Sequence, residues 1–164
     1  MVLLILLFLL LGAMQGVILT GDIFNLYVFI ELVTITSAAL VAFNRYLEDS
    51  LAAFKYLLYG VVGGLFFLLG VFLIYYNTGT LNLLLIADKF MQINKYMKIT
   101  ILLFFLTSLL IKLGIFPFHF WLPKAHSVCP GSISALLSGV LLKVFVYIFI
   151  RLFLDIFDYN FIEH

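Results

Sequence analysis

Long apolar runs separated by short polar breaks are the feature that most constrains this sequence. A helix needs about 20 largely apolar residues to cross the hydrocarbon core of a bilayer, and runs of that length recur throughout the 164 residues. Apolar residues make up 66% of the chain and charged residues only 10%, whereas soluble domains are about 45–50% apolar and about a quarter charged. A domain of this size buries only about 70% of its surface on folding, so the remaining apolar surface must face lipid. This composition excludes a cytosolic enzyme, a nucleic-acid-binding domain and a disulfide-stapled secreted module.

The positions of these runs predict five membrane spans, and no stretch shows the alternation typical of a strand. We therefore predict an all-α membrane protein with a single transmembrane domain over residues 1–164. The expected spans are residues 1–20, 24–43, 51–76, 99–126 and 133–154. Residues 77–98 combine a helix break, a short apolar run and several charges. We expect them to form an amphipathic segment at the membrane interface.

The fourth span contains two helix breakers, Gly114 and Pro117, which predict a discontinuous helix broken near residues 113–117. Unpaired backbone groups at membrane depth are tolerated only where they line a cavity or contact protein. In secondary transporters such breaks mark the ion pathway. An ordinary proline kink is the alternative, but the position of Lys112 beside the break favours the pathway interpretation.

Three charged side chains lie well inside the expected spans: Glu31, Lys112 and Lys143. A charge at the bilayer centre costs at least about 2.5–3.5 kcal/mol, so such a residue usually faces a polar cavity or a partner. We expect Glu31 to lie close to a lysine of another helix, in the first place Lys112. Desolvation disfavours a charged lysine and a nearby carboxylate favours it, so moving either partner can load or release a proton. The alternative to this proton relay is a static ion pair that only fixes helix packing.

Two further residues are candidate members of the pathway. His119 directly follows the helix break, and histidine titrates near neutral pH; the alternative is a structural hydrogen bond. Lys55 lies near the start of its span, where it could belong to the pathway or extend its ammonium to the interface. We expect no metal, because His126 and Cys129 lack the further ligands that a site needs. No nucleotide, flavin, iron–sulfur cluster or other cofactor is expected either.

Five stretches of the sequence resemble segments of one family of membrane proteins. They are residues 21–31 (GDIFNLYVFIE), 53–56 (AFKY), 78–82 (TGTLN), 112–126 (KLGIFPFHFWLPKAH) and 134–143 (SALLSGVLLK). In this order they are similar to the antiporter-like subunits of respiratory complex I, Mrp-type sodium/proton antiporters and membrane-bound hydrogenases. The resemblance implies that Glu31 and Lys112 form the central charged pair of a proton half-channel. It also implies that Lys143 carries protons onward to a second half.

Full members of that family have about fourteen helices, which include two inverted five-helix repeats. The resemblance covers the first repeat alone, which implies one half of an inverted-repeat antiporter-like fold. The implied function is a proton-translocating, or sodium/proton-exchanging, multi-pass subunit of a respiratory, Mrp-type or hydrogenase complex in the cell (inner) membrane. Its partners would be other membrane subunits, including one that supplies the second repeat if the gene is split. A fragment of a longer protein is the other explanation.

Two other functions stay open at this point. A structural anchor or assembly subunit would use its buried charges only to hold neighbouring subunits, without transporting ions. A quinone-binding membrane subunit of an oxidoreductase would need a quinone-sized pocket near His119 and Trp121. None of the three functions gives the chain a catalytic site of its own, and none involves nucleic acid.

Overall fold

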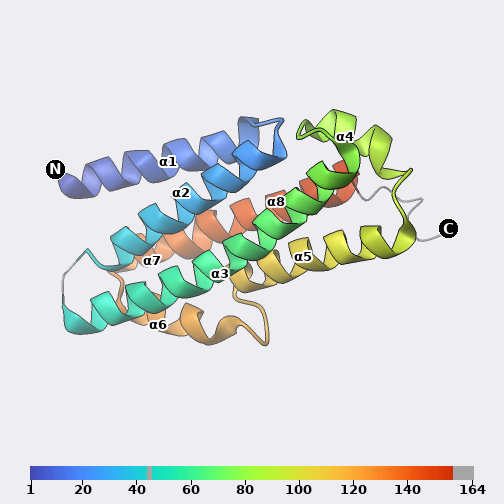
Figure 1. The fold of residues 1–164 in the computed structure, drawn as a ribbon. Helices are drawn as coiled ribbons and strands as arrows, with labels where there is room; N and C mark the ends of the chain where they lie inside the picture. Colours follow the sequence, from blue (N-terminus) through green and yellow to red (C-terminus); the bar gives the residue numbers. More distant parts are fainter. Residues whose placement is uncertain (44–45, 157–164) are drawn as a thin grey trace.

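The computed structural model describes residues 1–43 and 46–156, which form a bundle of long helices (Figure 1). Within these described residues, five helices are long and apolar enough to cross a membrane. They are α1 (Val2–Leu19), α2 (Ile23–Val41), α3 (Leu47–Thr78), α5 (Lys95–Leu113) and the helix over Gly131–Leu154. The described residues contain no strand, so the predicted all-α membrane fold is confirmed. Residues 44–45 and 157–164 of the expected domain lie outside this description.

α3 is the longest helix and differs most from its predicted span of residues 51–76. It has 32 residues and is therefore about 48 Å long, compared with about 30 Å for the hydrocarbon core. Its additional first turn carries Glu48 and Asp49. These acidic side chains are favourable at a helix amino terminus. The excess length places the two ends of α3 beyond the most apolar part of a bilayer.

Residues 77–98, predicted to be interfacial, contain the short helix α4 (Leu83–Phe90). The chain leaves α3 through Gly79, whose φ of 67° lies in the left-handed region that only glycine adopts readily. Eight residues extend only about 12 Å, too short to cross a bilayer. α4 buries Ile86 and leaves Leu84 79% exposed.

The loops that precede α2 and α4 bind each other at one end of the bundle. Two backbone hydrogen bonds of 2.9 Å join them, on either side of an antiparallel bridge between Asp22 and Asn82. The same two side chains cap their own helices. Asp22 Oδ1 accepts from the backbone N–H groups of Phe24 and Asn25 at 2.9 Å, and Asn82 accepts from Leu84 at 3.0 Å. Each cap satisfies N–H groups that a helix start leaves unpaired.

The helices pack so that α2 lies between α1 and α3, while α5 lies along the other side of α3 (Figure 1). α5 stops part-way along α3. After residues 114–118, a single 3₁₀ turn, η1 (His119–Trp121), and α6 (Leu122–Val128) cover the rest of that side of α3. The chain then crosses the bundle through α7 (Gly131–Leu136), the π-helical η2 (Leu137–Leu141) and α8 (Leu142–Ile156).

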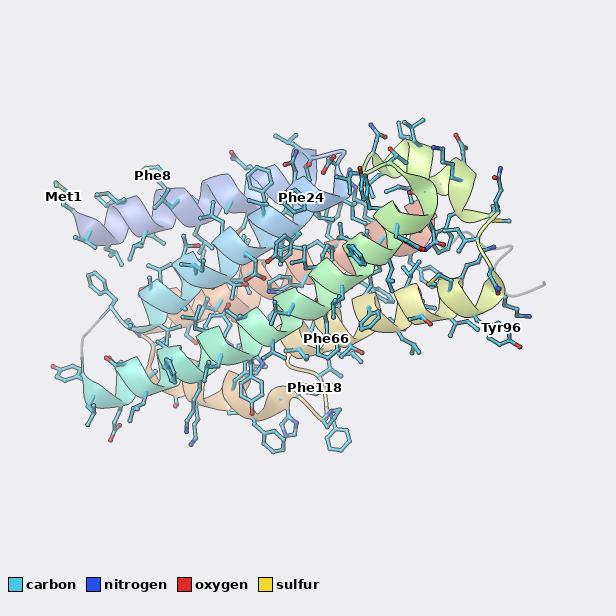
Figure 2. The ribbon with its side chains drawn as sticks, in the orientation of Figure 1. Met1, Phe8, Phe24, Phe66, Tyr96 and Phe118 are labelled. Atoms are coloured by element: carbon cyan, nitrogen blue, oxygen red, sulfur yellow. The ribbon has the colours of Figure 1, made fainter. Side chains whose placement is uncertain are left out.

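The outer surface of the bundle is strongly apolar. Phe8 on α1 and Phe72 on α3 are 71% and 60% exposed. Figure 2 shows the Phe8 side chain directed away from the other helices. Such large exposed apolar side chains would be unfavourable in water but are stable against lipid tails. Polar side chains at the middle of the spans are therefore more favourable in the interior of the bundle than on its outer surface.

The caps at the α2–α4 contact lead to a first prediction. Asp22→Ala removes both side-chain hydrogen bonds and should lower the free energy of unfolding by about 1 kcal/mol. Asp22→Asn keeps an acceptor oxygen and should retain most of that stability. Thermal unfolding of the purified protein in detergent measures both variants. If the asparagine variant unfolds as easily as the alanine variant, the side-chain cap is not what stabilises the contact between the loops before α2 and α4.

Candidate functional site

Lys112 of α5 and Glu31 of α2 form an ion pair in the interior of the bundle. Lys112 Nζ lies 2.9 Å from Glu31 Oε1, and the two side chains are 1% and 18% exposed. The predicted contact between these two residues is confirmed. Glu31 lies about 12 Å from the first residue of α2, close to the middle of that span. Both charges therefore sit at membrane depth, where each requires a partner.

The Lys112 ammonium has two further hydrogen-bond acceptors besides the carboxylate. It donates to Thr34 Oγ1 and to the Gly60 carbonyl oxygen, both at 3.0 Å. An ammonium has three N–H donors, and this site uses all three. The ring of Phe145 on α8 lies 5.9 Å from Nζ, within the range of a cation–π interaction. Four helices thus surround one positive charge.

Three glycines of α3 make room for the ion pair. A Cβ atom at Gly64 would collide with the Glu31 carboxylate, and one at Gly63 would lie 3.2 Å from Lys112 Cγ. At Gly60 a Cβ atom would collide with the Thr34 methyl group. Glycine spacing of this kind predicts close helix approach in a membrane. The sequence alone did not indicate that the glycines face the charged pair.

The end of α5 fixes the position of Lys112. Gly114 has a φ of 64°, and the N–H groups of Gly114 and Ile115 donate to carbonyls in the last turn of α5 at 3.2 and 3.1 Å. This pattern is a Schellman termination, which needs glycine at the left-handed position. Trp121 Nε1 also donates to the Ile111 carbonyl at 3.0 Å. Lys112 consequently lies in the final turn of a helix, where the negative end of the helix dipole stabilises a cation.

A second polar contact lies one helical turn from the ion pair and was not predicted. The hydroxyl groups of Tyr56 on α3 and Ser37 on α2 are 2.7 Å apart, and both residues are buried. The Tyr56 ring stacks on Trp121 with a centroid distance of 4.7 Å. Tyr56 precedes Gly60 by four residues, a spacing that places two residues on the same face of a helix. That spacing is the signal that could have added Tyr56 to the candidate site.

Ser108 adds another buried hydroxyl, one turn before Lys112 on the same face of α5. The residue is 0% exposed, and its Oγ atom has no hydrogen-bond partner among the described residues. A buried hydroxyl without a partner costs about 1–3 kcal/mol. Ser108 therefore keeps a free hydroxyl within one helical turn of the buried ammonium.

Lys143 lies outside the ion-pair cluster, on the outer surface of the last helix. It lines an open hollow of about 280 Å³ together with Gly139, Tyr147 and Ile18 of α1. The π-helical segment just before it contains an extra residue in its turn. An extra residue rotates the following helix by about 100°. In the resulting register Phe145, and not Lys143, points towards Lys112.

The structure does not bring the other two candidates, His119 and Lys55, to the pair. The His119 ring stacks on Phe120 with a centroid distance of 4.6 Å, and its buried Nδ1 has no partner among the described residues. Lys55 is exposed and lines a groove with Lys124. Among the described residues, neither candidate has a hydrogen bond or ion pair to Glu31. Their roles in a pathway stay predictions.

The two residues considered as metal ligands have other surroundings. His126 Nδ1 lies 2.9 Å from Ser134 Oγ, and Cys129 is a partly buried free thiol. Within residues 1–43 and 46–156, no group of three or more histidine, cysteine or acidic side chains could hold a metal ion.

Comparison with known proteins connects this site to a family. Residues 20–164 match the family described as NADH:quinone oxidoreductase/Mrp antiporter, transmembrane. A Na(+)/H(+) antiporter subunit of Alkalihalophilus pseudofirmus is 36% identical over 154 residues, which are 93% of this chain and 31% of that protein. An NADH-quinone oxidoreductase subunit of Desulforudis audaxviator is 38% identical over 145 residues, 86% of this chain and 28% of that protein.

The fold is also similar to that of a solved member of a respiratory membrane complex. A chain of the membrane-bound sulfane sulfur reductase, an archaeal respiratory membrane complex, superposes with a TM-score of 0.88 and 37% identity. The match covers 93% of this chain and 31% of that one. The chain thus spans less than a third of the length of these relatives. Because the family match covers most of its residues, the chain belongs to the antiporter-like transmembrane family of the NADH:quinone oxidoreductase and Mrp subunits.

Proposed function

We propose that this chain is a proton-conducting half-channel of a multi-subunit complex in the cell (inner) membrane. The observation that carries the proposal is the Lys112 ammonium, 1% exposed and bound by Glu31, Thr34 and the Gly60 carbonyl. A titratable cation held at membrane depth by a movable carboxylate can bind and release a proton. Relatives named as sodium/proton antiporter and NADH-quinone oxidoreductase subunits support this function.

Proton release would follow from a change in the distance between the two charges. At 2.9 Å the carboxylate compensates the buried ammonium. Breaking a buried pair leaves an uncompensated charge, which costs about 3–5 kcal/mol. Movement of the carboxylate away from Lys112 would therefore favour the neutral amine and the departure of its proton. Glu31 is the more exposed partner, so we assign the movement to Glu31.

Hydroxyl groups on either side of the pair support a route for the proton. Ser108 lies one turn before Lys112 on α5, and the Tyr56–Ser37 contact lies one turn from Thr34 and Gly60 on α2 and α3. A hydroxyl both donates and accepts a hydrogen bond, so it can pass a proton on without holding a charge. We propose that these groups connect Lys112 to the two ends of the bundle.

Lys143 would carry the proton out of this unit. Its exposed position in the hollow beside Gly139 leaves it available to a neighbouring helix. The chain matches less than a third of its relatives, so we propose that a second five-helix repeat packs near Lys143. That repeat would belong to another membrane subunit or to a further part of the same protein. Coupling to sodium or to a redox reaction would depend on these partners.

Exchanging the charges of Glu31 and Lys112 distinguishes a proton relay from a static ion pair. The double variant Glu31→Lys, Lys112→Glu keeps one charge of each sign and should leave the complex assembled on a native gel. We expect proton or sodium uptake into vesicles to fall about a hundredfold or more, because the proton-carrying group is displaced from its acceptors and from the helix end. Normal uptake by the exchanged pair would show that Glu31 and Lys112 form a static ion pair and not a relay.

Gly64→Ala tests the space around the carboxylate. The added Cβ atom would collide with Glu31, so we expect the ion pair to be displaced and uptake to fall about tenfold, with a stability loss of about 1–3 kcal/mol. The matched control is Gly12→Ala on α1, where nothing lies within 4 Å of a Cβ atom. It should leave uptake unchanged. Equal uptake by both variants would contradict the proposed role of the α3 glycines.

Lys143→Ala tests the outward step. Ion uptake should be abolished while the complex still assembles, because the removed side chain is exposed and leaves no buried cavity. Lys143→Arg should fail as well, since a guanidinium stays protonated and cannot release the proton. Vesicle uptake with the purified complex measures both variants. Normal uptake by the alanine variant would make Lys143 a structural residue.

A further inference from the structure

A groove on the outside of the bundle lies between α3, the end of α5 and the η1–α6 segment. Its volume is about 740 Å³, and its wall is largely apolar. Leu58, Val62 and Phe66 of α3 form one side, and Phe118 and Phe120 form the other. Figure 2 shows Phe66 and Phe118 on the same side of the bundle. Glu31 and Lys112 do not line the groove, but Ile111 and Trp121, whose hydrogen bond holds the end of α5, do. His119 is not among the lining residues, although Phe118 and Phe120 on either side of it are.

One end of the groove is positively charged. Lys55 of α3 and Lys124 of α6 line the groove and also line a more polar hollow that continues it, with Ser127 and Glu48. Both lysines are exposed, and neither forms a salt bridge among the described residues. Among the residues that line this hollow, two ammonium groups against one carboxylate leave a net positive charge. Asp49, in the same turn of α3 as Glu48, is buried and does not line it.

The position of Lys55 along α3 corresponds to the boundary between the hydrocarbon core and the lipid headgroups. If α3 is centred in the bilayer, about 9 Å of its length extends beyond the hydrocarbon core at each end. Lys55 lies about 12 Å from Leu47, the first residue of the helix, and therefore near that boundary. From Lys55 to Phe66 the apolar wall runs about 16 Å, which equals about half of the core and hence one leaflet.

We propose that this groove binds one anionic phospholipid. Its phosphate would lie between Lys55 and Lys124, and an acyl chain would lie along Leu58, Val62 and Phe66. Basic pockets between transmembrane helices recognise anionic headgroups in this way. A zwitterionic lipid places its own ammonium group beside its phosphate and therefore compensates the two lysines less than an anionic lipid does. An apolar helix would bury the two ammonium groups unpaired at high cost. Lys55 is also a candidate member of the proton pathway, so the test measures lipid occupancy of the groove, which does not require transport.

Photolabelling of the intact complex tests the site. The complex that contains this chain is reconstituted in phosphatidylcholine vesicles with a small amount of phosphatidylglycerol that carries a photoreactive acyl chain. We expect labelling of the peptides around Val62 and Phe118, which unlabelled phosphatidylglycerol competes away and phosphatidylcholine does not. Each lysine near a membrane surface changes anionic lipid affinity about fivefold, so Lys55→Gln with Lys124→Gln should weaken competition about 25-fold.

Two matched variants separate charge from shape. Lys89→Gln with Lys98→Gln removes two lysines near α4, away from the groove lining, and should leave labelling unchanged. Val62→Trp fills the apolar wall with a residue that is 45% exposed in the wild type, and it should block labelling without changing the charge. Equal labelling by the two lipids, or wild-type labelling of the Lys55/Lys124 variant, would overturn the proposal. A crosslink from a photoreactive residue at position 62 to another polypeptide of the complex would also overturn it.

Discussion

The compensation of one buried ammonium is the interaction on which the central part of this structure depends. Lys112 is 1% exposed within a bundle whose outer surface suits lipid, so the protein itself must provide every partner of the charge. Glu31 provides the opposite charge, Thr34 and the Gly60 carbonyl take the remaining donors, and a helix end contributes its dipole. Each partner reaches the ammonium only if its helix has a particular position and conformation. Together these conditions determine how the four helices pack.

Two of these requirements explain local features that otherwise look unrelated. The carboxylate fits against α3 only because Gly64 has no side chain. The ammonium lies at a helix end only because Gly114 stops α5 in mid-bundle, with Trp121 donating to a carbonyl of the last turn. A hydrogen bond of this kind is what allows a helix to end inside a membrane. The broken segment and the glycine face of α3 are thus two conditions for the same charge pair.

The sequence alone was sufficient to predict the features that depend on the difference in polarity between water and lipid. Apolar runs indicated the spans, and the cost of an isolated buried charge indicated that Glu31 and Lys112 would meet. Features that depend on side-chain geometry were not predictable in this way. No pattern indicated that the Tyr56 hydroxyl binds Ser37, or that a π-helical turn at Leu137–Leu141 sets the register in which Phe145 faces Lys112. α3 begins four residues before the expected span of residues 51–76, because the helix is long enough to carry Glu48 and Asp49 beyond the apolar core.

The central claim is that the Glu31–Lys112 pair separates and re-forms while ions cross the membrane. Time-resolved infrared difference spectroscopy of the purified complex during turnover observes the carboxylate stretch of Glu31 directly, with Glu31→Gln used to assign the band. The account predicts a Glu31 difference band that appears with turnover and disappears when Lys112 is replaced by glutamine. Ion transport at the normal rate with no change in the Glu31 band would contradict it, because the pair would then be a static contact.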